Sequence, residues 1–327
     1  MSGSDVVDED PDEGVPVAGT ADHEFAVRQA RESDVAHVVR FTRDTWGDKH
    51  GDYMPDVFAE WVETDGPRQR TFVVDVDDGD DVAGVVQCVL LSDTEAWAQG
   101  MRVNPDYRGN SLSSPLSRAG FRWARERGAV VSRNMVFSWN VAGLGQSRGV
   151  GFDPATEFRW LRPEPDADAD PALDVTADPD AAWAYWTRSE ARDHLRGLAL
   201  DAGEPWACSE LTRADLRAAA DRDGLFVVAD GGTRGFTSLA YTYDRETEDG
   251  VAETWGVYHV AAWDDPDALS ALTDAVARDA AERGIDATRI LIPEGVRWVS
   301  DAAATRTPVS DEPDFVMAAD LTDDALL

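Results

Sequence analysis

The feature that most constrains the fold is the stretch VNPDYRGNSLSS, residues 103–114, which lies between an apolar run and an amphipathic run. It combines a proline, an aromatic residue, an Arg-Gly pair and small residues, as phosphate-binding turns do. Such turns prefer glycine, yet Ser111 and Ser113 stand at two of these positions. The pattern predicts strand, turn and helix in that order, and therefore an α/β fold. Taken alone, it fits both a phosphate cradle and a structural turn that caps a helix.

The chain is strongly acidic, with 64 Asp and Glu against 30 Lys and Arg and a formal net charge of −34. Lys49 is the only lysine, and the acids are scattered without a repeated calcium-loop spacing. This pattern favours a surface suited to the molar salt of a halophile over a metal store or a mimic of nucleic acid. There is no basic stripe to neutralise phosphates, so nucleic acid is not an expected partner.

The cysteines indicate nothing more specific than a reducing compartment. Cys88 and Cys208 are far apart in the chain and belong to no Cys or His cluster, which predicts two buried thiols and no metal site. The first residues are acidic and lack the apolar segment of a signal peptide. No apolar run approaches the length of a membrane span. We therefore expect a cytoplasmic protein without a membrane partner.

The length of 327 residues suits two domains of ordinary size. Composition and periodicity predict a disordered acidic tail, a first domain, a Pro/Asp/Ala-rich linker and a second domain at 1–22, 23–163, 164–180 and 181–327. The first domain has the predicted element order β-α-α-β-β-β-α-β-α-β. The helix after the turn is expected from about Pro115 to Arg127, with Ser113 or Ser114 as its cap.

The second domain has a similar predicted element order but a different loop between strand and helix. Its sequence there is AAWDDPDALS, which contains no glycine and two aspartates. Carboxylates at that position would repel a pyrophosphate. The second half is therefore interpreted as a copy of the first that lost the chemistry of pyrophosphate binding or never had it.

Three local patterns together resemble the GNAT family of N-acetyltransferases. VNPDYRGNSLSSPL is similar to the family motif V-x-P-x-Y-R-G-x-G-x-G-x-x-L, from which Ser111 and Ser113 depart. The preceding strand AWAQGMRV is similar to one that opens at a bulge in the family. Asn140 is followed after eleven residues by Phe152 of a Gly-Phe pair, which matches a family spacing. The resemblance covers 23–163 and implies a mixed α/β GNAT fold, in tandem with a degenerate second half.

A closer resemblance is suggested by GDYMPDVFAEW, GMRV and the degenerate second half. Together they resemble a histidine N-acetyltransferase-like branch, whose acceptors are free amino acids. The resemblance implies direct attack of an amine on acetyl-CoA, without a metal. The cofactor-binding residues that it implies are Met101, Arg102, Val103, Arg108, Gly109, Asn110, Ser111, Leu112, Ser113 and Asn140.

The reaction also needs a base for the amine and a proton for the leaving thiolate. Asp93 and Glu95 are the candidate bases, with Asp52 and Glu60 behind them. Ser147 occupies the position of the tyrosine that often supplies the proton in the family, and a serine hydroxyl is a poor acid.

Tyr53 and Trp61 are the candidate acceptor-binding residues, because they come from the loop and helix that cover the amine site in this fold. Two functions from different classes remain open. The first is an active N-acetyltransferase for a small amine or amino acid, as a monomer or homodimer. The second is a non-catalytic acyl-CoA-binding or interaction module, which Ser111, Ser113 and Ser147 favour. The second half either shapes the acceptor pocket or only covers a sheet edge.

Overall fold

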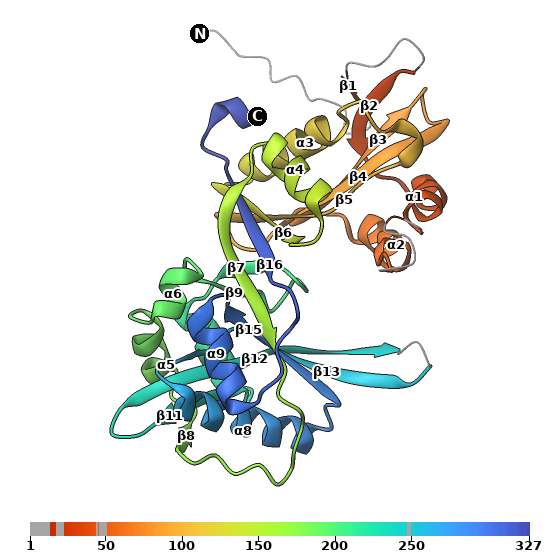
Figure 1. Cartoon of the computed structure of the whole chain (residues 1–327). Helices are drawn as coiled ribbons and strands as arrows, with labels where there is room; N and C mark the ends of the chain where they lie inside the picture. The colour runs from red at the N-terminus through yellow and green to blue at the C-terminus, as the bar shows by residue number, and fades with distance from the viewer. Residues whose placement is uncertain (1–13, 18–22, 44, 46–50, 247–249) are drawn as a thin grey trace. The chain divides into compact units, whose positions relative to one another are not determined.

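The computed structural model of the chain describes residues 14–17, 23–43, 45, 51–246 and 250–327. They divide into two compact units, each assembled from more than one stretch of chain (Figure 1). Unit 1 contains the described residues up to Asn134, with Gly145–Asp153 and Ala318–Leu327. Unit 2 contains Met135–Leu144 and the described residues of Pro154–Met317.

Unit 1 holds the elements predicted for the first domain up to the strand after the turn. Its strands are β1 Val15–Val17, β2 Phe25–Gln29, β3 Gln69–Val76, β4 Asp81–Leu90, β5 Glu95–Val103 and the first part of β6 Val131–Phe137. Its helices are α1 Val35–Thr42, α2 Met54–Thr64, α3 Ser113–Arg125 and the last part of α4 Val141–Gly149. Short 3-10 turns precede α1 at Glu32–Asp34 and follow β5 at Pro105–Tyr107.

The strands of unit 1 pair in the order β1-β2-β3-β4-β5-β6. All neighbours are antiparallel except β5 and β6, which are parallel and are joined through α3. A parallel pair needs a crossover connection, usually a helix, and the strand-turn-helix pattern at residues 103–114 supplies it. The mixed α/β sheet predicted from the sequence is confirmed.

The two faces of this sheet are covered by different helices, as strand alternation requires. Val74 and Val86 pack with Leu116 of α3, whereas the adjacent Val73 and Val85 belong to the cluster that contains residues of α1 and α2. Because successive side chains of a strand point to opposite faces, continuous valine runs in β3 and β4 can serve both layers.

The expected tail, residues 1–22, differs from the structure in one described segment. Val15–Val17 form β1 and pair with β2, with Val15 opposite Val27. This short apolar VPV stretch was assigned to the tail because acidic residues surround it. The remaining residues of that expectation, 1–13 and 18–22, lie outside the described residues.

Unit 2 holds the second element series together with most of β7. Its strands are β7 Asp153–Leu161, β8 Asp174–Thr176, β9 Leu198–Leu200, β10 Cys208–Glu210, β11 Leu225–Ala229, β12 Thr233–Glu246, β13 Ala252–Tyr258, β14 Ala262–Trp263, β15 Ala287–Pro293 and the first part of β16 Asp314–Asp320. Its helices are α5 Pro179–Trp186, α6 Glu190–His194, α7 Arg213–Ala220, α8 Pro266–Arg283 and α9 Val296–Thr305.

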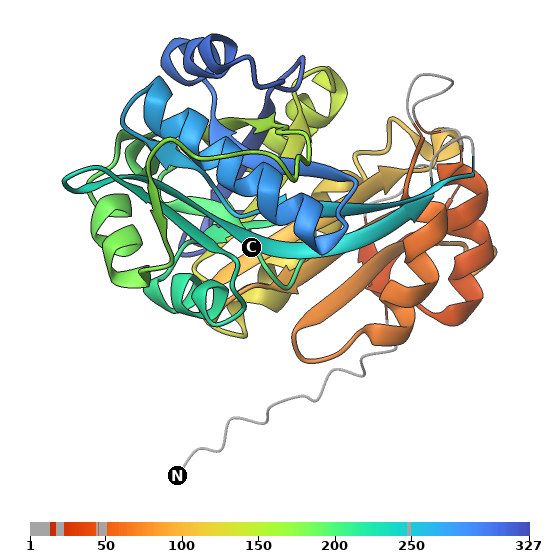
Figure 2. The same cartoon turned by 90° about the horizontal axis from the view of Figure 1, so that it is seen from below.

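The pairing in unit 2 repeats that of unit 1. Antiparallel neighbours run from β8 through β11 and β12 to β13, and β13 is parallel to β15. The long helix α8 joins the parallel pair and packs through Leu269, Leu272 and Val276 in the main core cluster of the unit. Figure 2 shows α8 lying along the strands that it covers. The tandem arrangement inferred from element order is therefore visible in the topology.

The expected linker, 164–180, is not free of regular structure. It contains β8, whose Val175 lies opposite Val228 of β11, and its last residues begin α5. The strand was not predicted because it is only three residues long and lies in a Pro/Asp/Ala-rich sequence. None of the helices in the described parts of the chain is long and apolar enough to cross a membrane.

Candidate functional site

Strand β5 carries a bulge directly before the loop at residues 103–114. Val85 lies opposite Arg102 and Gln87 lies opposite Gln99, so β5 uses one residue more than β4 over this stretch. Gly100, within the extra stretch, has a φ of +66°. A Cβ atom there would lie 2.5 Å from a ring carbon of Trp61. Both the backbone conformation and the packing of α2 against the strand therefore require glycine.

The bulge coincides with a separation of β5 from β6. Their parallel register runs from Glu95 opposite Val131 to Trp97 opposite Arg133 and ends there. Among the described strands, β5 pairs from Ala98 onwards with β4. In the described part of the chain, no strand therefore pairs with the other edge of β5 at Met101 and Val103. An extended ligand could hydrogen-bond to such an edge.

The loop after β5 presents a row of backbone N–H groups. Asn104 is buried, and its side chain accepts a hydrogen bond from Asp106 N at 3.2 Å, which fixes the start of the loop. Gly109 and Ser111 have φ angles of +91° and +55°. Among the described residues, no group accepts a hydrogen bond from the backbone N–H groups of 109–113.

The start of α3 differs from the sequence expectation. The helix begins at Ser113 rather than near Pro115, its N-cap position is Leu112, and no side chain caps it. The expectation that Ser113 or Ser114 caps the helix is therefore wrong. Ser113 is inside the first turn, where its backbone N–H points out of the helix end. The positive end of the α3 dipole is left open towards the loop.

Three arginines of the loop and of α3 have no ion pair to any described residue, and Arg122 lies in the last turn of the helix. Arg108 is exposed in the loop, and Arg118 and Arg122 are exposed one turn apart on α3. The last two, with Pro115, line a cavity of about 270 Å³ that β1 and Leu327 also border. In a chain with so many acids, two unpaired arginines beside one cavity form a local positive field. Arg118 and Arg122 were not predicted as site residues, although their i, i+4 spacing places them on one face of α3.

The predicted acceptor residues lie on the other side of the bulge. The rings of Tyr53 and Trp61 meet edge to face, with centroids 6.1 Å apart, and Tyr53 is 43% exposed. The guanidinium carbon of Arg102 lies 5.6 Å from the centre of the Tyr53 ring. Arg102 Nε also donates to Asp52 Oδ2 at 2.8 Å, and the Asp52 side chain is fully buried. Asp52 is therefore a structural partner of Arg102.

The predicted bases do not lie beside the loop. Arg133 donates to Glu95 Oε1 at 2.5 Å, and Ser92 Oγ donates to Glu95 Oε2 at 3.0 Å. Both carboxylate oxygens of Glu95 therefore already accept hydrogen bonds from protein side chains. Asp93 is exposed in the turn before β5. Glu95 is five residues from Gly100, about 17 Å along the strand.

Ser147 and Asn140 have local partners. Ser147 is buried, and its Oγ accepts a hydrogen bond from Asn134 Nδ2 at 3.1 Å. The Asn140 side-chain oxygen accepts from Gly143 N at 2.9 Å and so caps α4. The structure thus gives Asn140 a role in starting a helix, and it places Ser147 away from solvent.

In unit 2, the helix start that corresponds to that of α3 is capped by a side chain of the protein. Asp265 is the N-cap of α8, and its Oδ1 accepts from Ala268 N at 3.0 Å. Arg234 forms an ion pair with Asp265 and lies 3.4 Å from the Asp264 carboxylate. The helix end that could hold an anion is thus occupied by the protein's own carboxylate, which supports the expectation that unit 2 binds no pyrophosphate. No group of three or more His, Cys, Asp or Glu side chains within the described residues is arranged to hold a metal.

Residues 35–142 match the model of the Acetyltransferase (GNAT) family. The chain is also similar to three solved structures at low identity. A GCN5-related N-acetyltransferase from Sphaerobacter thermophilus is 14% identical with a TM-score of 0.57, covering 91% of this chain and 96% of that one. A candidate acetyltransferase from Thermoplasma acidophilum is 17% identical with a TM-score of 0.51, covering 90% and 99%.

The third is a glucosamine N-acetyltransferase region of a fungal multi-domain β-N-acetylglucosaminidase, 14% identical with a TM-score of 0.57, covering 92% of this chain and 38% of that one. No curated protein matches the chain. At these identities the solved structures establish the fold over nine-tenths of the chain. The family match falls on the segment that contains the bulged strand and the open helix end.

Proposed function

Because residues 35–142 make this chain a member of the GNAT superfamily of acetyltransferases, we propose that unit 1 transfers an acetyl group from acetyl-CoA to the amine of a small molecule. The observation that carries the proposal is the row of N–H groups at 109–113, which have no partner among the described residues. They lie at the open end of α3, where a helix dipole favours an anion such as a pyrophosphate. Arg108, in the same loop, adds positive charge there.

The bulged strand supplies the second half of the site. At Met101 and Val103 the edge of β5 away from β4 pairs with no described strand, and in this proposal it hydrogen-bonds the extended arm that leads to the thioester. A backbone N–H aimed at the thioester carbonyl stabilises the negative charge that develops on its oxygen during attack. In the reaction the amine nitrogen bonds to the acetyl carbon, the carbon–sulfur bond breaks, and the sulfur leaves as a thiolate.

Two proton transfers remain, and the side chains predicted for them are badly placed. Glu95 is held by Arg133, Asp93 is at the far end of β5, and the Ser147 hydroxyl is buried. We therefore assign the proton of the amine, and the proton that the thiolate needs, to water at the exposed side of the bulge. Such a reaction depends on positioning more than on a strong side-chain base.

Tyr53 and Trp61 form the acceptor side in this proposal. Tyr53 is exposed, touches Trp61 and is covered on one face by Arg102. An exposed aromatic surface suits a small amine, because the ring attracts a cationic group. In the proposal the acceptor is such an amine, for example a free amino acid. We place the protein in the cytoplasm of a halophile as a monomer or homodimer. The burial of Cys88 and Cys208 and the charge of −34 support that proposal.

A second candidate function is a non-catalytic acyl-CoA-binding module. The locked Glu95 and the buried Ser147 favour it, because neither can serve readily in proton transfer. The two candidates share the cofactor site and differ only in turnover. They are separated by measuring thiol release from acetyl-CoA in molar KCl against a panel of amines and amino acids, with calorimetric binding of acetyl-CoA measured in parallel.

The cofactor site itself is tested by Ser113→Asp, which puts a negative charge against the phosphates at the helix end. We expect the affinity for acetyl-CoA to fall by at least about tenfold, equivalent to about 1.4 kcal/mol. Ser300→Asp adds the same charge on the exposed face of α9 in unit 2 and should leave the affinity unchanged. If Ser113→Asp binds acetyl-CoA as well as the parent does, the cradle is not at α3 and the proposal fails.

A further inference from the structure

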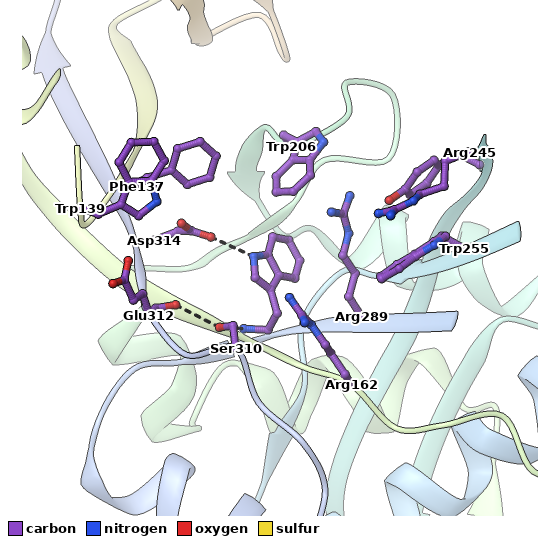
Figure 3. A pocket seen from close by; sticks show the side chains of 12 residues that line it. Phe137, Trp139, Arg162, Trp206, Arg245, Trp255, Arg289, Ser310, Glu312 and Asp314 are labelled. Atoms are coloured by element: carbon purple, nitrogen blue, oxygen red, sulfur yellow. Dashed lines mark hydrogen bonds between the residues drawn. The ribbon is translucent and has the colours of Figure 1, made fainter. Parts of the chain in front are cut away.

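Unit 2 contains a cavity of about 270 Å³ whose walls combine aromatic rings and arginines. Figure 3 shows Trp206, Trp255, Arg289 and Asp314 gathered around it. Its lining comes from the end of β6 with Trp139 after it, β7 with Arg162 after it, the β9–β10 loop, β12, β13, β15 and the segment at residues 310–314. The cavity is remote in sequence from the loop that carries the proposed acyl-CoA site, and nothing in acyl transfer requires it.

Arg289 of β15 is the central residue of this cavity. It is 5% exposed, and its guanidinium carbon lies 4.7 Å from the ring centre of Trp160 and 3.9 Å from that of Trp206. The Tyr243 ring centre is 5.3 Å away. Rings on its faces leave only the edge of the planar guanidinium for hydrogen bonds. Along that edge, Nε has no hydrogen-bond partner among the described residues, and Nη2 lies 3.5 Å from the hydroxyl of Tyr241.

A buried donor without a partner costs about 1–3 kcal/mol, and more when it is charged. Natural structures satisfy nearly all such groups with protein, water or ligand. The geometry that remains at Arg289 is an in-plane donor edge, which matches the two oxygens of a carboxylate. Arg289 can therefore receive an anion along the edge of its guanidinium, because aromatic rings already cover the faces.

The loop that carries Trp206 holds its indole over the Arg289 guanidinium. Its φ is +68°, a left-handed conformation that costs a bulky residue about 1–2 kcal/mol. Its loop is held by Asp201, whose carboxylate accepts from Gly203 N and from Ser209 Oγ, both at 2.8 Å. The indole is nevertheless 39% exposed. Strained residues that a well-bonded loop holds in place occur at ligand clamps.

The remaining charges of the cavity limit the charge of its ligand. Arg162 and Arg245 also line it, and Glu312 and Asp314 oppose them. Asp314 Oδ2 accepts a hydrogen bond from Trp160 Nε1 at 2.8 Å and so holds that indole against Arg289. Three arginines against two acids leave one positive charge in excess. This excess suits a monoanion better than a dianionic phosphate, which the two acids would repel.

We propose that the cavity of unit 2 binds a small aromatic carboxylate. Its carboxylate lies in the plane of the Arg289 guanidinium and accepts hydrogen bonds from the donor edge. Its ring packs against the indole of Trp206, which lines the cavity and is partly exposed. The volume lies just below the usual range for small-molecule pockets, about 300–1,000 Å³, so the ligand is a single ring system with a short acidic chain.

The proposal is tested by calorimetry on the full chain in molar KCl, with phenylacetate and indole-3-acetate as probes. We expect both acids to bind and phenylacetamide, which has the same shape but no charge, to bind at least about tenfold more weakly, as loss of a charge-assisted hydrogen bond implies. Phenyl phosphate is a further probe, which tests whether the site prefers a carboxylate to a phosphate. Binding of phenyl phosphate more tightly than phenylacetate would overturn the assignment to a carboxylate, and failure of both acids to bind would overturn the site.

Variants locate the binding. Arg289→Met keeps the length of the side chain without its donors and should weaken phenylacetate at least about tenfold while leaving phenylacetamide unchanged. If Arg289→Met does not fold, Trp206→Gly decides, because glycine suits the positive φ and removes the indole without backbone strain. Arg306→Gly is the matched control: it also has a positive φ, 60°, is exposed at the end of α9 and does not line the cavity. Equal affinity for phenylacetate in Trp206→Gly and Arg306→Gly would refute the proposal.

Discussion

Arg102 donates from Nε to the carboxylate of Asp52 at 2.8 Å, and this ion pair joins the segment that leads into α2 to the bulged part of β5. The Asp52 side chain is fully buried and that of Arg102 is 12% exposed. Arg102 also covers one face of Tyr53. The pair therefore sets the position of the proposed acceptor residues relative to the strand that would carry the thioester.

Removing one partner of this pair should destabilise unit 1. Asp52→Asn leaves the Arg102 guanidinium buried without its counter-charge, and we expect a loss of about 3 kcal/mol in the free energy of unfolding. The measurement is urea unfolding at molar KCl. Arg148→Gln is the control, because its ion pair with Asp153 is exposed and should be worth less than about 1 kcal/mol. Equal effects of the two substitutions would show that the Asp52 pair is not a buried constraint.

The role of Tyr53 is tested by its truncation to alanine. Tyr53→Ala should raise the KM of the acceptor amine several-fold and leave the affinity for acetyl-CoA nearly unchanged, because the exposed ring touches only Trp61 and Arg102 among the proposed site residues. Phe58→Ala is the comparison, since Phe58 is fully buried in the core and should lower the melting temperature instead. Parallel losses of acceptor binding, cofactor binding and melting temperature in Tyr53→Ala would favour a packing role.

The two serines of the loop should respond oppositely to glycine. Ser111 has a φ of +55°, so Ser111→Gly relieves strain and should stabilise the protein by up to about 1 kcal/mol. Ser113 is helical, so Ser113→Gly should cost about 0.5–1 kcal/mol. Both variants keep every N–H donor and should retain acetyl-CoA affinity. Thermal unfolding and calorimetry measure the two effects, and a stabilising Ser113→Gly would contradict the observed helix start.

Salt should strengthen the binding of acetyl-CoA. At low ionic strength the net charge of −34 repels an anionic cofactor, and at 1 M salt the repulsion is screened within about 3 Å. We expect the affinity to rise from dilute buffer to molar KCl, opposite to an ordinary phosphate site. The folded fraction must be followed by circular dichroism at each salt concentration. Affinity that falls with salt while the protein stays folded would contradict this expectation.

Asp314 should make stability depend on pH. Burial raises its pKa to about 6, although the indole of Trp160 and the charges of Arg289 and Arg162 act in the opposite direction, and Glu312 adds to the rise. The folded state therefore holds the proton more tightly than the unfolded chain. This contribution to stability is present below the unfolded pKa and is lost as pH rises through about 6.

Asp314→Asn removes this titration and keeps an oxygen that can accept from Trp160. Relative to the parent, the variant should gain up to about 3 kcal/mol at pH 8 and little at pH 4, as two pKa units imply. Buried His259, whose pKa is lowered to about 4 by burial, titrates in both proteins and cancels in the comparison. A difference between parent and variant that does not change between pH 4 and pH 8 would contradict the shifted pKa.

Local patterns predicted much of unit 1. The strand before the loop and the helix after it follow from the pattern of apolar residues and the small residues at 109–114, whereas the bulge was expected only from the resemblance to the GNAT family. Helix ends were less well predicted, because no side chain marks the start of α3. The strand β1 was missed because only its pairing with β2 reveals it.

Long-range contacts could not be predicted from one sequence. Glu95 looked like a free acid on a strand until its partner Arg133, 38 residues later, was known. The second half looked inert because its loop lacks glycines. Its cavity is formed by Trp160, Trp206 and Arg289, which no local spacing connects.

The closed helix end at Asp265 has a consequence for how the chain could have evolved. Once Asp265 and Arg234 had neutralised one another at the start of α8, recovering nucleotide binding there would require at least two coordinated changes, because either residue alone leaves an unpaired charge. A duplicated copy in that state is released from selection for its ancestral ligand. Such a copy can keep the same topology while its sequence diverges elsewhere. The cavity residues on β15 and in the β9–β10 loop are examples of such a place.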